Sequence, residues 1–352
     1  MRFLRTPLGK LCCYIVILLL AVVAVVWFFD PFYQYHRPFA GMEAVLNDRD
    51  NQMPGTIRNF EYDSVLVGSS VAENFDSSFL DEHYDCQTLK IIRASGSVAD
   101  LLYYLEMAQE ERTLKNVFWC LDLFALEAST EVTLYGQDTP RYLHTETVLD
   151  DVTYLLNKEV LFEKIPISLA SGYLGRNTGG KAYDWSHDKE FGAAKAMQAY
   201  EKPKEKLKSQ DFSEDIPLIR QNITNLAAQI TDHPETQYRI LLPPYSMMWW
   251  DCAEMNGTLE KQFYMLEQVM PVLLSLPNVE VYYFQDEEAI VCNLDHYMDM
   301  IHYTPRVNQY MLEQMTVSDK QWEAENWQGK LQEMKDLVDR IIRTEIYKYY
   351  EE

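Results

Sequence analysis

The sequence predicts an α/β domain built on a parallel sheet and preceded by one membrane-spanning helix. Five short apolar runs alternate with helical patterns along residues 62–352, and one uncharged run of 19 residues lies near the N-terminus. Strands that are apolar along their whole length are typical of a parallel sheet covered by helices on both faces. Repeated strand-then-helix units therefore indicate a doubly wound, three-layer α/β/α domain.

The uncharged run covers residues 11–29 and predicts a transmembrane helix. As a helix it would be about 28 Å long, which is close to the hydrocarbon thickness of a bilayer. It ends in Trp27-Phe28-Phe29, an aromatic cluster typical of a membrane interface and unlike the small-residue cleavage site of a signal peptide. We therefore expect a cytoplasmic leader (1–10), an uncleaved anchor (11–29) and a juxtamembrane segment (30–61).

The distribution of charge predicts the orientation in the membrane and excludes one class of partner. Arg2, Arg5 and Lys10 precede the span, which predicts a cytoplasmic N-terminus and an extracellular C-terminal domain. The chain has 31 Lys and Arg against 54 Asp and Glu, and removing those three cations leaves 28 against 54, a formal charge near −26 outside. Because binding to nucleic acid requires a basic face, we expect no nucleic-acid partner.

The order of elements follows from the same patterns. Strands are predicted over residues 64–68, 89–94, 116–126, 238–242 and 279–284. Apolar residues at helical spacing predict amphipathic helices over 100–112, 258–274 and within the tail 320–350. Residues 127–210 lack sustained periodicity, so we expect an insertion in the 62–352 domain that caps the sheet and shapes a substrate site.

Gly68-Ser69-Ser70 follows the first predicted strand, and Ser70 is a candidate nucleophile. A serine hydroxyl needs a base to remove its proton and a third group to orient that base. His302 is the strongest candidate base, since Asp299 lies three residues before it and Thr304-Pro305 then begins a helix. An Asp-x-x-His turn can hold a carboxylate beside one ring nitrogen and leave the other for a serine. The alternative is a turn in which Ser70 only caps a helix.

These two blocks resemble the first and last motifs of the SGNH/GDSL hydrolases, a family with a flavodoxin-like fold. The resemblance implies that Ser70 is the nucleophile and that Asp299 and His302 complete a triad. It also implies that the backbone N–H groups of Gly96, in "RASGSVAD", and Ser70 form an oxyanion hole. The membrane-anchored bacterial branch is closer still, through "DPFYQYHRP", "LLPPYS" and "DHYMDMIHY".

The sequence departs from the family at its third block, Gly-x-Asn-Asp, whose asparagine donates to the oxyanion hole. The corresponding strand end here reads Cys120-Leu121-Asp122. An ionised aspartate accepts hydrogen bonds and would repel a developing oxyanion, and losing one donor costs about 10²–10³ in rate. Three alternatives stay open: a slower enzyme, a hole built differently, with protonated Asp122 or with Asn74, or loss of catalysis.

The resemblance implies a membrane-anchored extracellular serine esterase or O-acyltransferase that acts through an acyl-enzyme on an envelope polysaccharide or teichoic-acid-like polymer. Relatives in this branch act in D-alanyl transfer to lipoteichoic acid or in polysaccharide O-acetylation, often beside a multi-span acyl exporter, which is therefore an expected partner. No metal or organic cofactor is expected, and the cysteines show no metal-ligand spacing. The alternative is a catalytically inactive SGNH-fold protein that serves as a binding or assembly factor.

Overall fold

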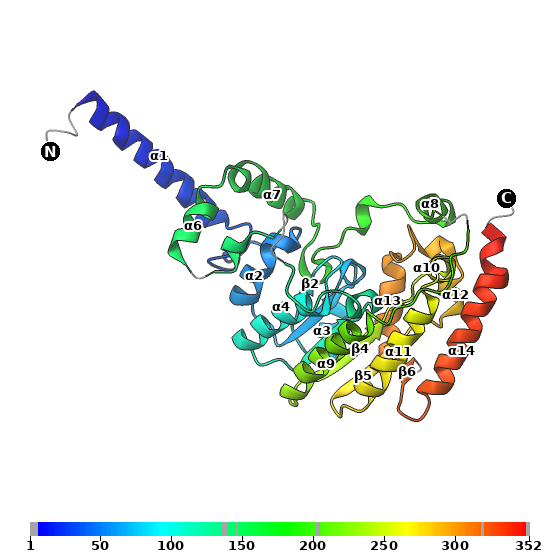
Figure 1. Ribbon diagram of the computed structural model, residues 1–352. Helices are drawn as coiled ribbons and strands as arrows, with labels where there is room; N and C mark the ends of the chain where they lie inside the picture. Colours follow the sequence, from blue (N-terminus) through cyan, green and yellow to red (C-terminus); the bar gives the residue numbers. More distant parts are fainter. Residues whose placement is uncertain (1–5, 135–138, 146, 202–204, 318–319, 350–352) are drawn as a thin grey trace. The chain divides into compact units, whose positions relative to one another are not determined.

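The computed structural model describes residues 6–134, 139–145, 147–201, 205–317 and 320–349. The chain divides into two compact units (Figure 1). Unit 1 is Met1–Glu61 with Leu134–Tyr183, and unit 2 is Tyr62–Thr133 with Asp184–Glu352. Arg2 and Arg5 of the predicted leader, and position 350 at the end of the predicted C-terminal helix, lie outside the described residues.

Unit 2 is a mixed α/β domain around a six-stranded sheet with the strand order β2-β1-β3-β4-β5-β6. The strands are β1 (Ser64–Gly68), β2 (Thr88–Ile92), β3 (Asn116–Cys120), β4 (Gln237–Leu242), β5 (Val279–Tyr283) and β6 (Gln321–Trp322). The first five are parallel, as the sequence predicts, whereas β6 pairs antiparallel with β5. The two-residue strand β6 was not predicted, and β3 is shorter than predicted because Leu123–Leu126 forms a short helix, α5.

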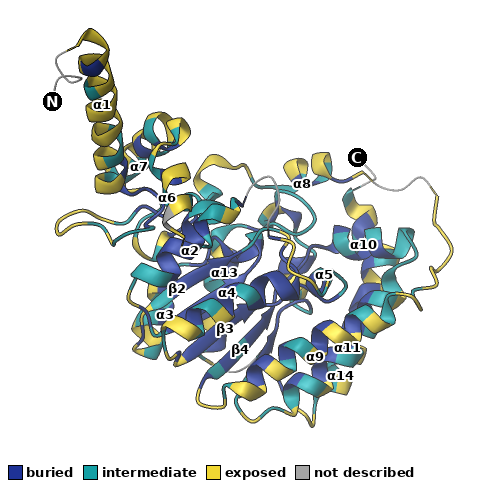
Figure 2. Ribbon diagram, turned by 60° about the vertical axis from the view of Figure 1, so that its left-hand side comes forward, coloured by how far each residue is buried: buried dark blue, intermediate teal, exposed yellow. Residues whose placement is uncertain are grey.

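Helices lie on both faces of this sheet. Helix α3 (Ser77–Tyr84) connects β1 to β2, and α4 (Val98–Glu111) connects β2 to β3 in the opposite direction across the sheet. Because such crossovers are right-handed, α3 and α4 lie on opposite faces. Helices α9 (Ile216–Asp232) and α11 (Leu259–Leu274) continue in the direction of α4, and α9 packs against both α4 and α11. The strands between the two layers are buried (Figure 2).

The remaining helices of unit 2 complete the α/β domain. They are α8 (Ala193–Ala199), α10 (Met247–Met255), α12 (Glu288–Val291), α13 (Pro305–Met315) and α14 (Trp327–Arg340). The predicted C-terminal helix therefore begins at Trp327, and it continues after α14 as a π-helical turn, Ile341–Glu345, and a 3₁₀ turn, Ile346–Tyr349. Its apolar side is buried, in agreement with the predicted amphipathic pattern.

Unit 1 begins with α1 (Pro7–Phe29), which contains the predicted span. The helix is long and apolar enough to cross a membrane, and only 6% of its most apolar window is buried. Thr6 begins it, because its Oγ1 accepts a hydrogen bond from the Gly9 N–H at 3.0 Å. The helix ends at Asp30, whose backbone adopts the left-handed conformation with φ 35°.

The Asp30 carboxylate fixes the chain directly after α1. It accepts hydrogen bonds from the backbone N–H groups of Gln34, Tyr35 and His36 at 3.0, 2.8 and 3.2 Å. The Tyr154 hydroxyl donates a fourth at 2.8 Å. Burial raises the pKa of Asp30 even though these donors favour the carboxylate. Because Tyr154 comes from α6 (Val148–Leu155), part of the predicted insertion folds against the exit of α1.

The predicted insertion, residues 127–210, is therefore divided between the two units. Unit 1 contains α6, a π-helical turn η4 (Val160–Lys164) and α7 (Ile165–Tyr173), and an isolated bridge pairs Val45 with Thr178. The segment that follows Tyr183 belongs to unit 2. Sequence patterns do not reveal this division, because it depends on contacts with residues more than 100 positions earlier.

Helix α2 (Arg49–Asn59) holds the predicted juxtamembrane segment in place. The Gln52 side chain donates to the Pro31 and Val45 carbonyl oxygens at 2.8 and 2.9 Å. Gly55 lets the two segments approach closely, since a Cβ atom there would collide with the backbone carbonyl oxygens of Phe32 and Tyr33.

We expect Gly55→Ala to destabilise unit 1 by about 1–3 kcal/mol, because the methyl group forces α2 away from the chain that follows α1. Gly329→Ala is the matched control: it lies in exposed helix with no atom near the added Cβ, and should stabilise by about 0.5–1 kcal/mol. Thermal unfolding of the detergent-solubilised full chain checks both. Equal shifts for the two variants would contradict the close approach at Gly55.

Candidate active site

Strand β1 brings Ser70 to the carboxyl edge of the sheet in unit 2. The strand is completely buried, and Ser70 begins the 3₁₀ turn η2 (Ser70–Ala72) two residues after it ends. The turn requires glycine at Gly68, because a Cβ there would lie 2.6 Å from the Ala72 Cβ and 3.2 Å from the Cys120 Cβ. Ser69 is buried beneath the turn, whereas Ser70 is partly exposed and accessible to a substrate.

The predicted base lies in a tight turn before α13. A bridge between Tyr297 and Tyr303 closes this turn. Inside it, Asp299 Oδ1 accepts hydrogen bonds from the backbone N–H groups of Ile301 and His302 at 2.9 and 2.8 Å, and Asp299 Oδ2 lies 2.7 Å from His302 Nδ1. The carboxylate is thus held by backbone donors on one oxygen and orients the imidazole with the other.

The structure brings Ser70, His302 and Asp299 together, as the sequence predicts. Ser70 Oγ lies 2.8 Å from His302 Nε2, although the two residues are 232 positions apart. Burial alone would raise the pKa of Asp299, but the His302 side chain and the backbone donors hold that pKa below its ordinary value. An ionised Asp299 favours the Nδ1–H tautomer of His302, which leaves Nε2 as the acceptor for the Ser70 proton.

Trp185 is a site residue that the sequence analysis did not identify. Its indole Nε1–H donates to the Ser70 carbonyl oxygen at 3.2 Å, and its backbone N–H donates to Asn74 Oδ1 at 3.2 Å. Its ring meets the His302 ring edge-on, with centroids 5.4 Å apart and an interplanar angle of 88°. The only signal in the sequence was the expectation that the 127–210 insertion shapes a site, which does not single out one residue.

The predicted oxyanion donors are arranged differently from expectation. The Gly96 N–H donates to the Arg93 carbonyl oxygen at 3.0 Å, so it is occupied within its own turn. Ser70 is the first residue of η2, so its N–H has no acceptor within that turn. Asn74 is 7% exposed, and since Oδ1 accepts from Trp185, its NH₂ group faces elsewhere. The Ser70 N–H is therefore better placed as a donor than the Gly96 N–H, and Asn74 keeps two N–H groups that Trp185 does not occupy.

Asp122 follows β3 and is almost completely buried, with 3% of its surface exposed. The Tyr245 hydroxyl donates to Asp122 Oδ1. Burial raises the pKa of Asp122 to about 6, while hydrogen bonds from Ser69 and Tyr245 and the nearby His302 oppose the rise. The carboxylate is thus bound by two hydroxyl groups beneath the Ser70 turn, and when ionised it has no hydrogen to donate to an oxyanion.

A buried lysine supports the turn from the neighbouring strand. Lys90 of β2 is 2% exposed, and its Nζ donates to the Glu73 carbonyl oxygen at 2.8 Å. Burial lowers the pKa of Lys90 to about 7, and the charges of Asp184, Asp76 and Glu73 oppose this. Through the Glu73 carbonyl oxygen, Lys90 supports the backbone directly after the Ser70 turn. Within the described residues, no three His, Cys, Asp or Glu side chains are grouped as a metal site.

No protein-family model and no curated protein matches the chain. Among solved structures, the chain is distantly similar to a protein from Streptococcus pneumonia that is named, provisionally, as a platelet activating factor. The two chains are 11% identical, the match covers 76% of this chain and 90% of that chain, and the TM-score is 0.39. A likeness this distant says nothing about activity.

We expect Asp122→Asn to stabilise the protein at pH 7.5, because the ionised carboxylate is costly to bury. Because the folded-state pKa of about 6 lies above the ordinary value of 3.8, the wild type loses stability as the pH rises from about 4 to just above 6. The gain from Asp122→Asn should therefore be absent near pH 4 and reach at most about 3 kcal/mol above pH 7.

Urea unfolding of the full chain across this pH range measures the effect, and Glu82→Gln, an exposed change of the same chemistry, controls for net charge. A gain for Asp122→Asn that does not depend on pH would show that the carboxylate titrates normally.

Proposed function

We propose that unit 2 is an SGNH-like serine esterase or O-acyltransferase with a flavodoxin-like fold. The observation that carries this proposal is the continuous contact from Asp299 Oδ2 to His302 Nδ1 at 2.7 Å and from His302 Nε2 to Ser70 Oγ at 2.8 Å. The six-stranded, mostly parallel sheet and the position of Ser70 after its first strand support the same reading.

The chemistry follows from this arrangement. Ser70 Oγ attacks the acyl carbonyl carbon as His302 Nε2 takes its proton, and Asp299 stabilises the resulting imidazolium. The Ser70 N–H and the Asn74 amide would bind the oxyanion. When the tetrahedral intermediate collapses, the imidazolium returns the proton to the departing alcohol, which leaves an acyl group on Ser70. Water or a sugar hydroxyl then attacks the acyl-enzyme, so hydrolysis and transfer share this intermediate.

The polymer proposed here, as acyl donor in hydrolysis or as acyl acceptor in transfer, is an envelope polysaccharide or teichoic-acid-like polymer. Helix α1, long and apolar enough to span a membrane, would hold unit 2 at the cell surface with the N-terminus in the cytoplasm. A multi-span acyl exporter would supply the acyl group. The high negative charge of the chain argues against a nucleic acid as its partner.

A fluorophosphonate probe tests the nucleophile. We expect the wild type to be labelled on Ser70, and Ser70→Ala and His302→Ala to lose labelling, because loss of either group lowers reactivity by about 10⁴-fold or more. Ser69→Ala is the matched control. The Ser69 hydroxyl is buried and accepts from the Val71 N–H, and no described hydrogen bond joins it to His302, so labelling should persist. Labelling that survives in Ser70→Ala would contradict the assignment.

A second candidate is a catalytically inactive binding or assembly factor with this fold. Two observations favour it: the Gly96 N–H is already bonded to Arg93, and Asp122 replaces an oxyanion donor. A folded but unlabelled wild type would select this reading.

Mass spectrometry of the envelope polymers tests the substrate. Two strains are compared with the wild type: one carries Ser70→Ala in the chromosomal copy and the other lacks the protein. We expect the acyl content of the polymers to change by the same amount in both. A binding factor would differ, because Ser70→Ala would leave the acyl content at the wild-type level while deletion alters it. Unchanged acyl content in both strains would remove the polymer from the proposal.

A further inference from the structure

Unit 1 exposes a group of large apolar side chains on residues 148–174, a stretch that we call the α6–α7 segment. Tyr173, Leu149 and Phe162 are 92%, 79% and 77% exposed. Others in the segment are also exposed: Val152, Leu156, Ile167, Leu169 and Leu174. Residues 165–175 carry no charged side chain at all. Single exposed apolar residues are ordinary, but so many on one short segment indicate a surface that is covered in the working protein.

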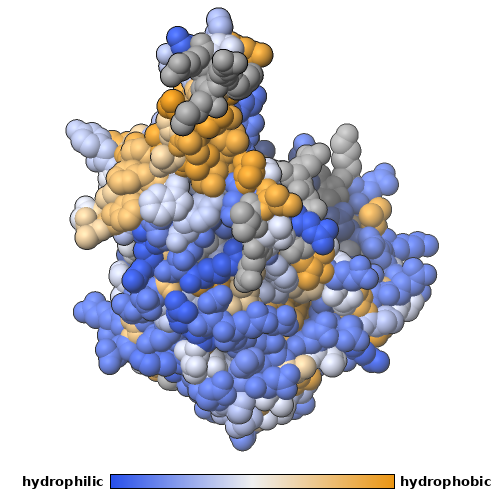
Figure 3. Space-filling view, turned by 90° about the vertical axis from the view of Figure 1, so that its left-hand side faces the viewer, coloured by the Kyte–Doolittle hydropathy of each residue, from blue (hydrophilic) through white to orange (hydrophobic). Residues whose placement is uncertain are grey.

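The α6–α7 segment lies beside the outer end of α1. The Tyr154 hydroxyl of α6 bonds to Asp30, the residue that ends α1. Val26 of α1 shares a buried cluster with Tyr154, Val160 and Ile165. Figure 3 shows hydrophobic side chains along α1 and on the surface next to its base, where the rest of this face is largely hydrophilic. If α1 spans a bilayer, these contacts hold the segment at the depth of the membrane interface.

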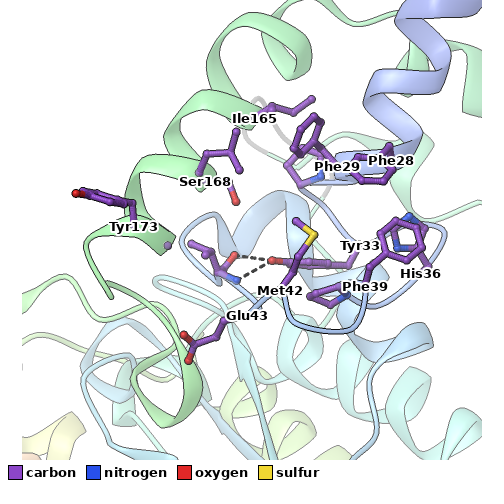
Figure 4. Close-up of a pocket in the computed structure, with 15 residues that line it drawn as sticks. Phe28, Phe29, Tyr33, His36, Phe39, Met42, Glu43, Ile165, Ser168 and Tyr173 are labelled. Atoms are coloured by element: carbon purple, nitrogen blue, oxygen red, sulfur yellow. Dashed lines mark hydrogen bonds between the residues drawn. The ribbon is translucent and has the colours of Figure 1, made fainter.

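An apolar cavity of about 230 Å³ opens in the same region. Phe28 of α1, Phe39 and Met42 of the following chain, and Ser168 and Leu169 of α7 contribute to its walls (Figure 4). The Tyr33 hydroxyl is occupied, because it donates to the Val45 carbonyl oxygen at 3.1 Å and accepts from the Val45 N–H at 2.8 Å. His36 and Glu43 also line the cavity; both ring nitrogens of His36 are bonded to carbonyl oxygens, whereas the exposed Glu43 carboxylate lies at the solvent side. Because most of the wall is hydrocarbon, it suits an acyl chain better than water or a polar ligand.

The charges of the segment distinguish an acyl chain from a lipid headgroup. Residues 148–174 contain two lysines against four acidic residues. One of the lysines, Lys164, is already paired with Asp48 at 2.6 Å. A site for anionic headgroups requires a cluster of basic residues, which this segment lacks. Burial of apolar surface is therefore the available source of affinity.

We propose that the α6–α7 segment is embedded in the outer leaflet beside α1 and that its cavity takes an acyl chain of a membrane lipid. The chain would gain a second, interfacial attachment in addition to the span. This inference needs α1 to cross a bilayer and does not depend on the chemistry of Ser70.

Photo-crosslinking tests the proposal. The full chain is placed in nanodiscs of zwitterionic phosphatidylcholine that contain a phosphatidylcholine with a diazirine in its acyl chain, and adducts are mapped by mass spectrometry. We expect adducts on residues 160–174 and 38–45 in addition to α1, and none on α14, an amphipathic helix whose apolar side is buried within unit 2. Adducts confined to residues 7–29 would overturn the proposal, since they would show α1 as the sole lipid contact.

A pair of variants isolates the cavity. Ser168→Phe fills it, so adducts on residues 38–45 should be lost while those on exposed Phe162, which does not line the cavity, remain. Ser168→Ala keeps the cavity open and should retain the wild-type adduct map. Adducts on 38–45 that persist in Ser168→Phe would place the acyl chain outside the cavity. Because the wild-type map stands on its own, the proposal stays testable even if Ser168→Phe does not fold.

Discussion

The hydrogen bond between Ser70 Oγ and His302 Nε2 is the contact on which the catalytic proposal for unit 2 depends. It forms only if β1 ends at Gly68 and if the turn from Tyr297 to Tyr303 closes around Asp299. Parallel pairing places the ends of all the central strands at one edge, so residues from the two ends of the domain meet there without a long detour of the chain. The sheet therefore determines the distance between Ser70 Oγ and His302 Nε2.

Much of the fold and part of the site could be predicted, because they depend on local patterns. A buried parallel strand such as β1 is apolar at every position, and an Asp-x-x-His turn such as Asp299–His302 carries both partners in four residues. Trp185 could not be predicted, because nothing in its neighbours says that it turns toward Ser70. The same holds for the Gly96 N–H, whose acceptor, the Arg93 carbonyl, is fixed by the backbone course of one turn.

The region beneath Ser70 is unusual because it buries groups that normally carry charge. Asp122 is satisfied by hydroxyl donors from Ser69 and Tyr245, and Lys90 by a backbone carbonyl and nearby acids. Each such group costs free energy to desolvate, and each restricts the conformations of the residues around it. Burying Asp122 and Lys90 thus lowers the folding stability of unit 2 and restricts the conformation of the turn at Ser70.

The four hydrogen bonds to the Asp30 carboxylate have a mechanical consequence. A membrane helix followed by a flexible linker turns independently of what it carries. Here the backbone of residues 34–36 and the Tyr154 hydroxyl all donate to the Asp30 carboxylate, so the connection after α1 is rigid. If α1 spans a bilayer, any tilt or rotation that the bilayer imposes on it is passed directly to the folded residues around Asp30, so the bilayer thickness would affect their orientation.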